Sequence, residues 1–179
     1  MSEPAAASLL LEQESSDLTG EFPLDLANYA LHLVVVIGRQ RELDLERLLQ
    51  AHGSSFVRHR ALSVIRRVQP CTMRDLAEFG SADRTTMTRT VDQLVAAGLV
   101  VRTTPPNDRR QVQLSLTQAG VATHTESMKL ANGLMEGVIE GIDEEALRAA
   151  VRTYERIAAN VIGDPARARR LLLREGERG

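Results

Sequence analysis

The chain has 179 residues, 43% hydrophobic and 26% charged, so it is long enough to bury a sizeable core in one compact domain or two small ones. Tryptophan is absent and aromatic residues make up only 3%, which disfavours aromatic platforms that stack single-stranded nucleic acid. A single cysteine excludes an internal disulfide framework and fits a reducing compartment. The longest apolar stretch, residues 33–37, is far shorter than the roughly 20 residues of a membrane span, so we expect a cytoplasmic protein.

Charge is distributed unevenly, although the net charge is only −2. Residues 1–50 carry three basic and nine acidic side chains, residues 51–118 carry ten and five, and residues 119–179 carry nine and ten. The middle third is therefore a basic segment. Of the 22 cations, 21 are arginine, which suits the reading of grooves and phosphates; genomic base composition explains this bias equally well.

The N-terminal part predicts an arm followed by one long helix. Residues 1–22 mix Ala, Ser and Glu without a cap or sustained periodicity, so we expect a mobile arm. From Leu24 to Leu49 apolar residues recur at helical spacing, between Pro23 at the entry and Gly53 after the exit.

The basic segment begins with three further predicted helices. Ser54 or Ser55 can cap the first, which runs through Val68 and is ended by Pro70. The second is short, and Thr72 with Asp75 has the spacing of a capping box at its start.

The third of these helices has two distinct faces. Asp83 caps it and Gly98 closes it, and its apolar residues form one inner stripe. The outer face carries hydroxyl, guanidinium and amide groups from Arg84, Thr85, Thr86, Thr88, Arg89 and Gln93. Two short helices with this arrangement predict a helix-turn-helix.

After Gly98 the pattern changes from helical to strand periodicity. Residues 99–104 are rich in β-branched side chains, and residues 111–116 alternate strictly between apolar and polar. Between them lies a turn-forming loop tipped with Arg109 and Arg110. We therefore expect a hairpin of two strands behind the helix-turn-helix, which is a wing, and no other sheet.

The C-terminal part predicts two more helices. Thr117 caps a helix that runs to about Gly141, and Asp143 caps one that the sequence Gly163-Asp164-Pro165 stops. Both have apolar stripes, and residues expected to point inward include Val121, Met128, Ala131, Met135, Val138 and Ile142. The expected fold is mainly α with a small β-hairpin wing, and residues 164–179 are expected to be a C-terminal tail.

With these elements in place, the sequence resembles the MarR family of winged helix-turn-helix transcriptional regulators over about residues 24–162. The resemblance is carried by LAEFGSADRTTMTRTVDQLVAAGLVVR at 76–102 and by DRRQVQLSLTQAG at 108–120, which fits the family's wing signature of Asp, Arg and a Leu-Thr pair opening the next helix. It implies a homodimer with intertwined first and last helices, in agreement with the two long apolar helices at opposite ends of the chain. We expect a dimerisation helix at 23–53, a DNA-binding domain at 54–117 and C-terminal dimerisation helices at 118–163.

Candidate DNA-binding residues lie on the outer helix face and in the wing. The side chains of Thr85, Thr86, Thr88 and Arg89 can meet base edges and phosphates in a major groove roughly 12 Å wide. Arg84, at the helix N-terminus, is better placed for phosphate. The resemblance places Arg110 in the minor groove with Asp108 orienting it and Arg109 beside it. The competing interpretations are a solvated helix face and an ordinary hairpin tip.

Other polar residues suggest secondary roles. His32, His59 and Arg60 are candidates for an effector pocket in the cleft that the resemblance implies, where they would pair with a carboxylate or phenolate; capping or bridging of helices is an equally good interpretation. The four histidines lack acidic or cysteine partners at ligand spacing, so we expect no metal and no cofactor. Cys71 precedes a helix N-terminus and suggests redox sensing, although a small semi-buried residue is the commoner explanation.

The expected function is that of a homodimeric, sequence-specific regulator that binds double-stranded DNA. It would be a ligand-responsive repressor with a palindromic operator and a small aromatic or phenolic effector. We expect no enzyme, because no catalytic constellation is found in the sequence. The alternatives are a winged-helix protein-interaction module without DNA binding and a redox-sensing regulator that uses Cys71.

Overall fold

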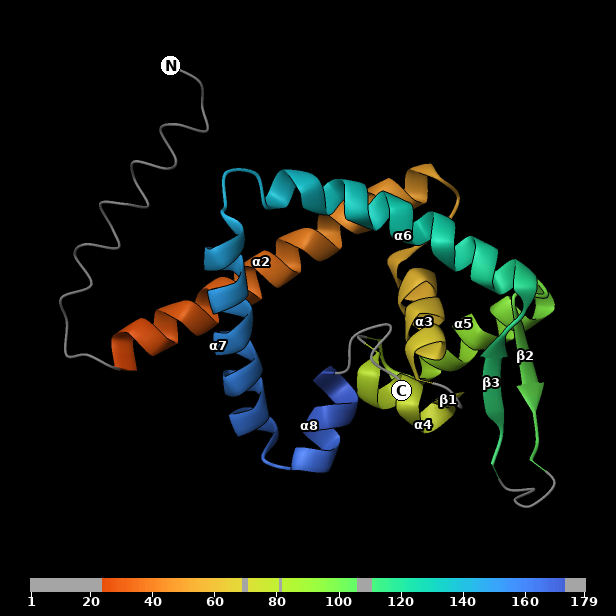
Figure 1. Cartoon of the computed structure of the whole chain (residues 1–179). Coiled ribbons are helices and arrows are strands. Elements are labelled where there is room, and N and C mark those ends of the chain that lie inside the picture. Colours follow the sequence, from red (N-terminus) through yellow and green to blue (C-terminus); the bar gives the residue numbers. More distant parts are fainter. Residues whose placement is uncertain (1–23, 69–70, 81, 106–110, 173–179) are drawn as a thin grey trace. The chain divides into compact units, whose positions relative to one another are not determined.

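The computed structural model describes residues 24–68, 71–80, 82–105 and 111–172, with side chains from Asp25 to Arg169 inside those ranges. The predicted arm and the tip of the wing lie outside them. The chain divides into two compact units, Met1–Asp44 and Leu45–Gly179, and each is described by itself. The elements in chain order are α2 (Leu24–Ala51), α3 (Phe56–Arg67), β1 (Cys71–Thr72), α4 (Met73–Phe79), α5 (Arg84–Ala96), β2 (Val100–Thr103), β3 (Gln113–Leu116), α6 (Gln118–Val138), α7 (Glu144–Ile162) and α8 (Pro165–Leu172) (Figure 1).

The predicted caps begin the helices of the second unit. The Ser55 hydroxyl accepts a hydrogen bond from the Arg58 amide at 3.4 Å, so of the two candidate serines it is Ser55 that caps α3. At α4 the capping box is complete, because the Asp75 amide donates to the Thr72 hydroxyl at 3.2 Å and the Thr72 amide donates to the Asp75 carboxylate at 2.8 Å. These bonds satisfy amides that a helix start leaves without an intrahelical partner.

The end of α5 is fixed by a glycine. Gly98 has φ +68°, a left-handed conformation that side chains other than glycine rarely adopt. The Gly98 amide donates to the Val95 carbonyl and the Leu99 amide donates to the Leu94 carbonyl, both at 2.9 Å, which is the Schellman arrangement. The chain therefore turns sharply from α5 into the wing.

The sheet has three antiparallel strands in the order β1-β3-β2. In β2 and β3, Arg102 pairs with Leu114, and on the other side of β3, Cys71 pairs with Leu114. The expectation of only two strands was wrong, because β1 has two residues and is too short to show an alternating pattern. The mainly α fold with a small wing is otherwise confirmed.

The helices α3, α4 and α5 and the sheet enclose one hydrophobic core, which we call the winged-domain core. Its buried side chains are contributed by every element from α3 to β3. They are Ala61, Leu62, Val64, Ile65, Val68, Cys71, Leu76, Phe79, Met87, Val91, Leu94, Val100 and Leu114.

The wing and α6 meet at a tight seam. The Thr117 hydroxyl donates to the Gly98 carbonyl at 2.7 Å and the Thr117 amide donates to the Leu99 carbonyl at 3.0 Å. At Gly120, in the first turn of α6, an added Cβ would lie 2.0 Å from the Leu99 carbonyl oxygen. Only glycine permits this approach, so α6 starts directly against the root of β2.

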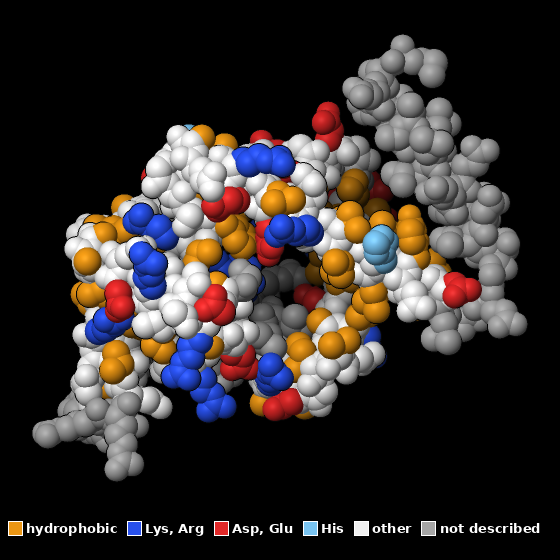
Figure 2. Space-filling view, turned by 180° about the vertical axis from the view of Figure 1, so that it is seen from behind, with side chains coloured by type: hydrophobic (Ala, Val, Ile, Leu, Met, Phe, Trp, Pro, Cys, Tyr) orange, Lys and Arg blue, Asp and Glu red, His pale blue; other side chains and the backbone are white. Residues whose placement is uncertain are grey.

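The long helices leave much apolar surface exposed. None of the described side chains of α7 is buried, and Val161 is 77% exposed. Val138 and Ile142, expected to point inward, are exposed, because no described element of the same chain covers them. Figure 2 shows apolar side chains along the N-terminal half of α2, which include Leu26, Leu31, Val34, Val35, Val36 and Ile37.

The chain does not end its regular structure at α7. Gly163, with φ +70°, terminates α7, and α8 follows within the segment expected to be a tail. The Asp164 carboxylate accepts hydrogen bonds from the Ala166 amide at 2.9 Å and the Arg167 amide at 3.2 Å. The residues that stop one helix therefore also start the next, with Asp164 as a cap and Pro165 in the first turn, where proline is tolerated.

Candidate nucleic-acid interface

The start of α5 is organised by one carboxylate. Asp83 accepts hydrogen bonds from the Thr85 amide at 2.9 Å, the Thr86 amide at 3.0 Å and the Thr86 hydroxyl at 2.7 Å. These bonds, that of the Thr86 hydroxyl above all, hold the pKa of Asp83 below its usual value. Asp83 therefore stays ionised, and it orients Thr86 at the N-terminal end of the helix.

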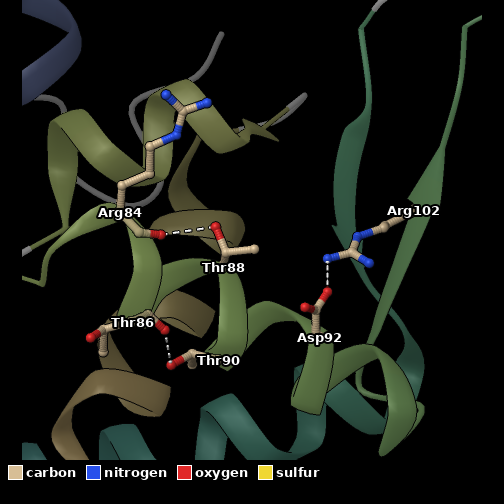
Figure 3. A network of polar contacts seen from close by, with 6 residues as sticks. All are labelled: Arg84, Thr86, Thr88, Thr90, Asp92 and Arg102. Carbon is tan, nitrogen blue, oxygen red and sulfur yellow. Dashed lines mark hydrogen bonds and ion pairs between the residues drawn. The ribbon is translucent and has the colours of Figure 1, made fainter.

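The outer face of α5 has the composition and exposure that the sequence predicted. Its six predicted side chains, Arg84, Thr85, Thr86, Thr88, Arg89 and Gln93, are all exposed. The Thr88 hydroxyl donates to the Arg84 carbonyl at 2.8 Å, so its proton is directed into the helix (Figure 3). The hydroxyl protons of Thr86 and Thr88 are thus used locally, which leaves their oxygens and methyl groups to meet an external partner.

The inner face of α5 anchors it in the winged-domain core. Met87, Val91 and Leu94 are buried there. Thr90 is also buried, and its hydroxyl donates to the Thr86 carbonyl at 2.9 Å (Figure 3). Because the inner side chains are fixed by packing, the outer face is presented by a rigid helix.

An ion pair ties the wing to α5. The Arg102 guanidinium on β2 contacts the Asp92 carboxylate on α5, as Figure 3 shows. Both side chains are partly exposed, so the pair contributes at most about 1 kcal/mol to stability. Its value is geometric, since it links the two elements that flank the candidate interface. Sequence reasoning missed this pair, because a separation of ten residues across a turn has no periodic signature.

The predicted wing residues Asp108, Arg109 and Arg110 lie outside the described residues. On either side of them, β2 ends at Thr103 and β3 begins at Gln113. The hairpin that would carry the three side chains is therefore present.

Two candidate effector residues have structural contacts within the second unit. The His59 Nδ1 lies 3.0 Å from the Ser127 hydroxyl, and the Ser127 hydroxyl donates to the His124 carbonyl at 2.9 Å. Because this donation uses the only hydroxyl proton of Ser127, His59 must be the donor in its bond to Ser127. The Arg60 Nη2 donates to the Phe79 carbonyl at 3.3 Å. His59 thus bridges α3 and α6 and Arg60 bridges α3 and α4, while His32 belongs to the first unit.

The environment of Cys71 disfavours redox chemistry. The side chain is fully buried in the winged-domain core. Burial, with a smaller contribution from the Asp75 charge, raises the pKa of the Cys71 thiol to about 12. Because the thiolate is the reactive form, this cysteine is a poor oxidant sensor in the folded protein.

Two further observations describe what the structure lacks. Within the described ranges, no group of three or more His, Cys, Asp or Glu side chains is arranged to hold a metal ion. A search of the same residues finds no helix with the length and apolarity of a membrane span.

The three antiparallel strands, the capped helix pair α4 and α5, and the hairpin behind it define a winged helix-turn-helix protein. A sequence profile described as the MarR family matches residues 52–111. The transcriptional regulator PA3341 is 28% identical with a TM-score of 0.66, over 74% of this chain and 98% of that one. A MarR family transcriptional regulator from Silicibacter pomeroyi is 26% identical with a TM-score of 0.67, over 76% of this chain and 92% of that one.

The matched profile and these solved structures support a MarR-family winged-helix regulator. Members of that family are transcription regulators and not enzymes, in agreement with the expectation for this chain. A mutant MarR from E. coli, crystallised with operator DNA, is 23% identical with a TM-score of 0.59, over 70% of this chain and 91% of that one. At that identity the likeness concerns the fold.

Proposed function

We propose that the protein is a homodimeric regulator that binds a palindromic operator in double-stranded DNA through α5 and the wing. The observation that carries this proposal is the exposed Thr and Arg face of α5, which a buried inner face and the Asp83 cap hold rigid. A solvated helix face more often carries Glu and Lys than several β-branched threonines, whose helix propensity is mediocre. The mutant MarR crystallised with operator DNA, which has a similar fold, supports the same reading.

The residues divide between reading bases and holding phosphates. Thr86, Thr88 and Arg89 project from the exposed face and would meet base edges in the major groove. Arg84 and Thr85, in the first turn, would contact phosphates, because helix N-termini attract anions. In the wing, Arg110 would enter the minor groove and Asp108 would orient it.

The exposed apolar surface supports a homodimer. We propose that residues 24–50 and 118–162 form its interface, since α7 leaves every described side chain at least partly exposed and α2 exposes a run of aliphatic residues. Such surface on a monomer in water is unfavourable, and a second copy of the chain would cover it. A two-fold dimer presents two equivalent α5 helices, so the operator would be a near-palindrome with half-sites about 10 bp apart.

The finer regulatory role is proposed by analogy with the MarR family. We propose a repressor whose DNA affinity falls when a small aromatic or phenolic effector changes the spacing of the two wings. The contacts of His59 and Arg60 would couple such an effector to the DNA-binding part, because they connect α3 to α6 and to α4. The competing proposal, a protein-interaction module without DNA binding, gives no role to the exposed Thr and Arg side chains of α5.

Selection of bound fragments from random-sequence DNA by the purified protein tests this proposal. We expect recovery of a near-palindromic motif. Thr86→Ala and Arg89→Ala should change the preferred bases, whereas Thr125→Ala, an exposed threonine on α6, is the matched control and should not. Failure to enrich any motif, or only asymmetric single sites, would contradict the proposal.

The wing is tested on the operator that this selection yields. Arg110→Ala should cost about 1–3 kcal/mol of binding and Arg109→Ala less. Asp108→Ala should also weaken binding, although it removes a negative charge near DNA, because the freed arginine must then be ordered at an entropic cost. Tighter binding by the Asp108 variant, or equal losses of affinity at the two arginines, would contradict a positioned arginine. The wing tip would then act only through its positive charge.

A further inference from the structure

The C-terminal helix α8 is an unexpected basic element. From Pro165 to the end, the sequence carries five arginines and two glutamates, and α8 itself contains Arg167, Arg169 and Arg170 but no acidic residue.

An ion pair between residues distant in the sequence docks α8 on the helix-turn-helix. The Arg167 Nε donates to the Glu78 Oε1 on α4 at 2.9 Å, across 89 positions of sequence. The Glu78 side chain is 22% exposed, so the pair is partly shielded from water. Next to Arg167, Ala168 is buried. These contacts place α8 beside the first helix of the helix-turn-helix.

The docked position lies at the end of the unit from which the wing projects. A hollow of about 470 Å³ lies beside the ion pair. It is bounded by the start of α4, the start of α8 and the root of the wing, and its lining includes Thr72, Arg74, Gln111, Asp164 and Arg167. Figure 1 shows α8, α4 and the open ends of β2 and β3 at this same end of the second unit. At the lower end of the space-filling view, basic side chains lie next to acidic ones (Figure 2).

The acidic groups around the hollow are engaged in holding the structure together. Asp75 accepts from the Thr72 amide and hydroxyl, Asp164 accepts from the first amides of α8, and Glu78 pairs with Arg167. By contrast, Arg74 and Arg169 are exposed. Arg169 lies two residues beyond Arg167, which is about 200° round the helix, so it points away from the side that docks.

We propose that α8 is an accessory DNA contact, in which Arg169 binds the phosphate backbone that flanks the site read by α5. This inference rests on the proposed DNA binding by the winged domain. B-DNA carries one negative charge per about 1.7 Å of its axis, so arginines next to α4 meet phosphates outside the core operator without reading their sequence.

The test compares the wild-type chain with its Arg169→Ala variant on two duplexes. One contains only the selected operator core, and the other has about ten additional base pairs on each side, one further turn of duplex. The wild type should bind the longer duplex more tightly. The Arg169→Ala variant should lose that preference, with affinity lower by roughly fivefold per missing phosphate contact at 0.15 M salt and a salt slope smaller by about 0.9 per contact.

The matched control is Arg156→Ala, which removes the same charge from the face of α7 opposite its apolar stripe and should leave binding unchanged. A second variant, Glu78→Gln, keeps the arginines but removes the docking partner of α8, and it should weaken the preference for the longer duplex in part. Equal binding of both duplexes by the wild type, an unchanged salt slope in the Arg169→Ala variant, or tighter binding by that variant would overturn this inference alone. Absence of any DNA binding by the wild type would overturn the proposed function as well.

Discussion

The winged domain and helix α7 both have amphipathic elements, but they differ in how far their apolar side chains are buried. In the winged domain, three helices and a sheet converge, and side chains such as Leu94 and Leu114 lose all contact with water. In α7 the stripe that includes Leu147, Tyr154 and Val161 stays exposed to water over 37–77% of each of these residues. An apolar stripe therefore indicates that a helix packs against a partner, but it does not indicate which partner. Whether the partner is in the same chain depends on the neighbouring elements.

The largest effect on stability is expected in the winged-domain core, where the chain buries its own apolar side chains. Leu94→Ala should lower the free energy of unfolding by about 3 kcal/mol, because it leaves a cavity beneath α5. Urea denaturation followed by circular dichroism measures this loss. Val112→Ala, at a 41% exposed position before β3, is the control and should stay within about 0.5 kcal/mol of the wild type. Equal losses of unfolding free energy at both positions would contradict the difference between buried and exposed apolar residues.

The second effect concerns α7. Tyr154→Glu places a charge in the exposed stripe and should weaken subunit association by about 2 kcal/mol or more. Sedimentation at micromolar concentration should then show a shift from twice the chain mass toward the chain mass. Arg156→Glu, on the opposite face, should keep the dimer. A wild type that sediments as a stable monomer would refute the proposed partner of the stripe.

A smaller effect is expected at the ion pair between the two elements of the candidate interface. Arg102→Ala and Asp92→Asn should each cost little stability, and a double-mutant cycle in urea should give a coupling of at most about 1 kcal/mol, because both side chains are partly exposed. Operator binding should weaken more than stability does, since the wing is no longer tied to α5. A coupling of several kcal/mol would assign the pair to the core instead.

The smallest effect is a pH dependence at the start of α5. The pKa of Asp83 is lowered in the folded protein, so its ionised form stabilises the fold above its ordinary pKa, and this contribution is lost as pH falls through the lowered pKa. Asp83→Asn should leave stability at pH 7 nearly unchanged, because asparagine is an equally good cap. Between about pH 5 and pH 2 the wild type should lose more stability than the variant. Parallel acid titrations of the two proteins would contradict this assignment.

Local signals explain what could be predicted from the sequence. Caps such as Thr72 with Asp75 act within one helical turn, so residue type and spacing were sufficient to place the start of α4 and the outer face of α5. The wing was visible because strict alternation over six residues is a strand pattern. The capping and exposure of α5 therefore followed from residues within a window of about fifteen positions.

The features that were missed depend on distant residues or on very short segments. Strand β1 has two residues and exists because β3 offers a free edge, with Cys71 opposite Leu114. Helix α8 was not predicted, because Asp164 and Pro165 were interpreted as the end of the preceding helix. The same two residues also begin a helix. The contact between His59 and Ser127 joins residues 68 positions apart, and no local pattern encodes it.

The seam at Gly120 makes the wing an extension of α6. The Leu99 carbonyl oxygen leaves no room for a side chain there, and the two bonds from Thr117 close the joint on the other side. Helix α6 has 21 residues, which corresponds to about 31 Å of rigid rod. A tilt of roughly 5° about the far end of such a rod displaces its near end by about 3 Å, close to the rise of one base pair. Gly120 thus lies at the moving end of the rod, where a small rotation of α6 would shift the attached hairpin by about the rise of one base pair.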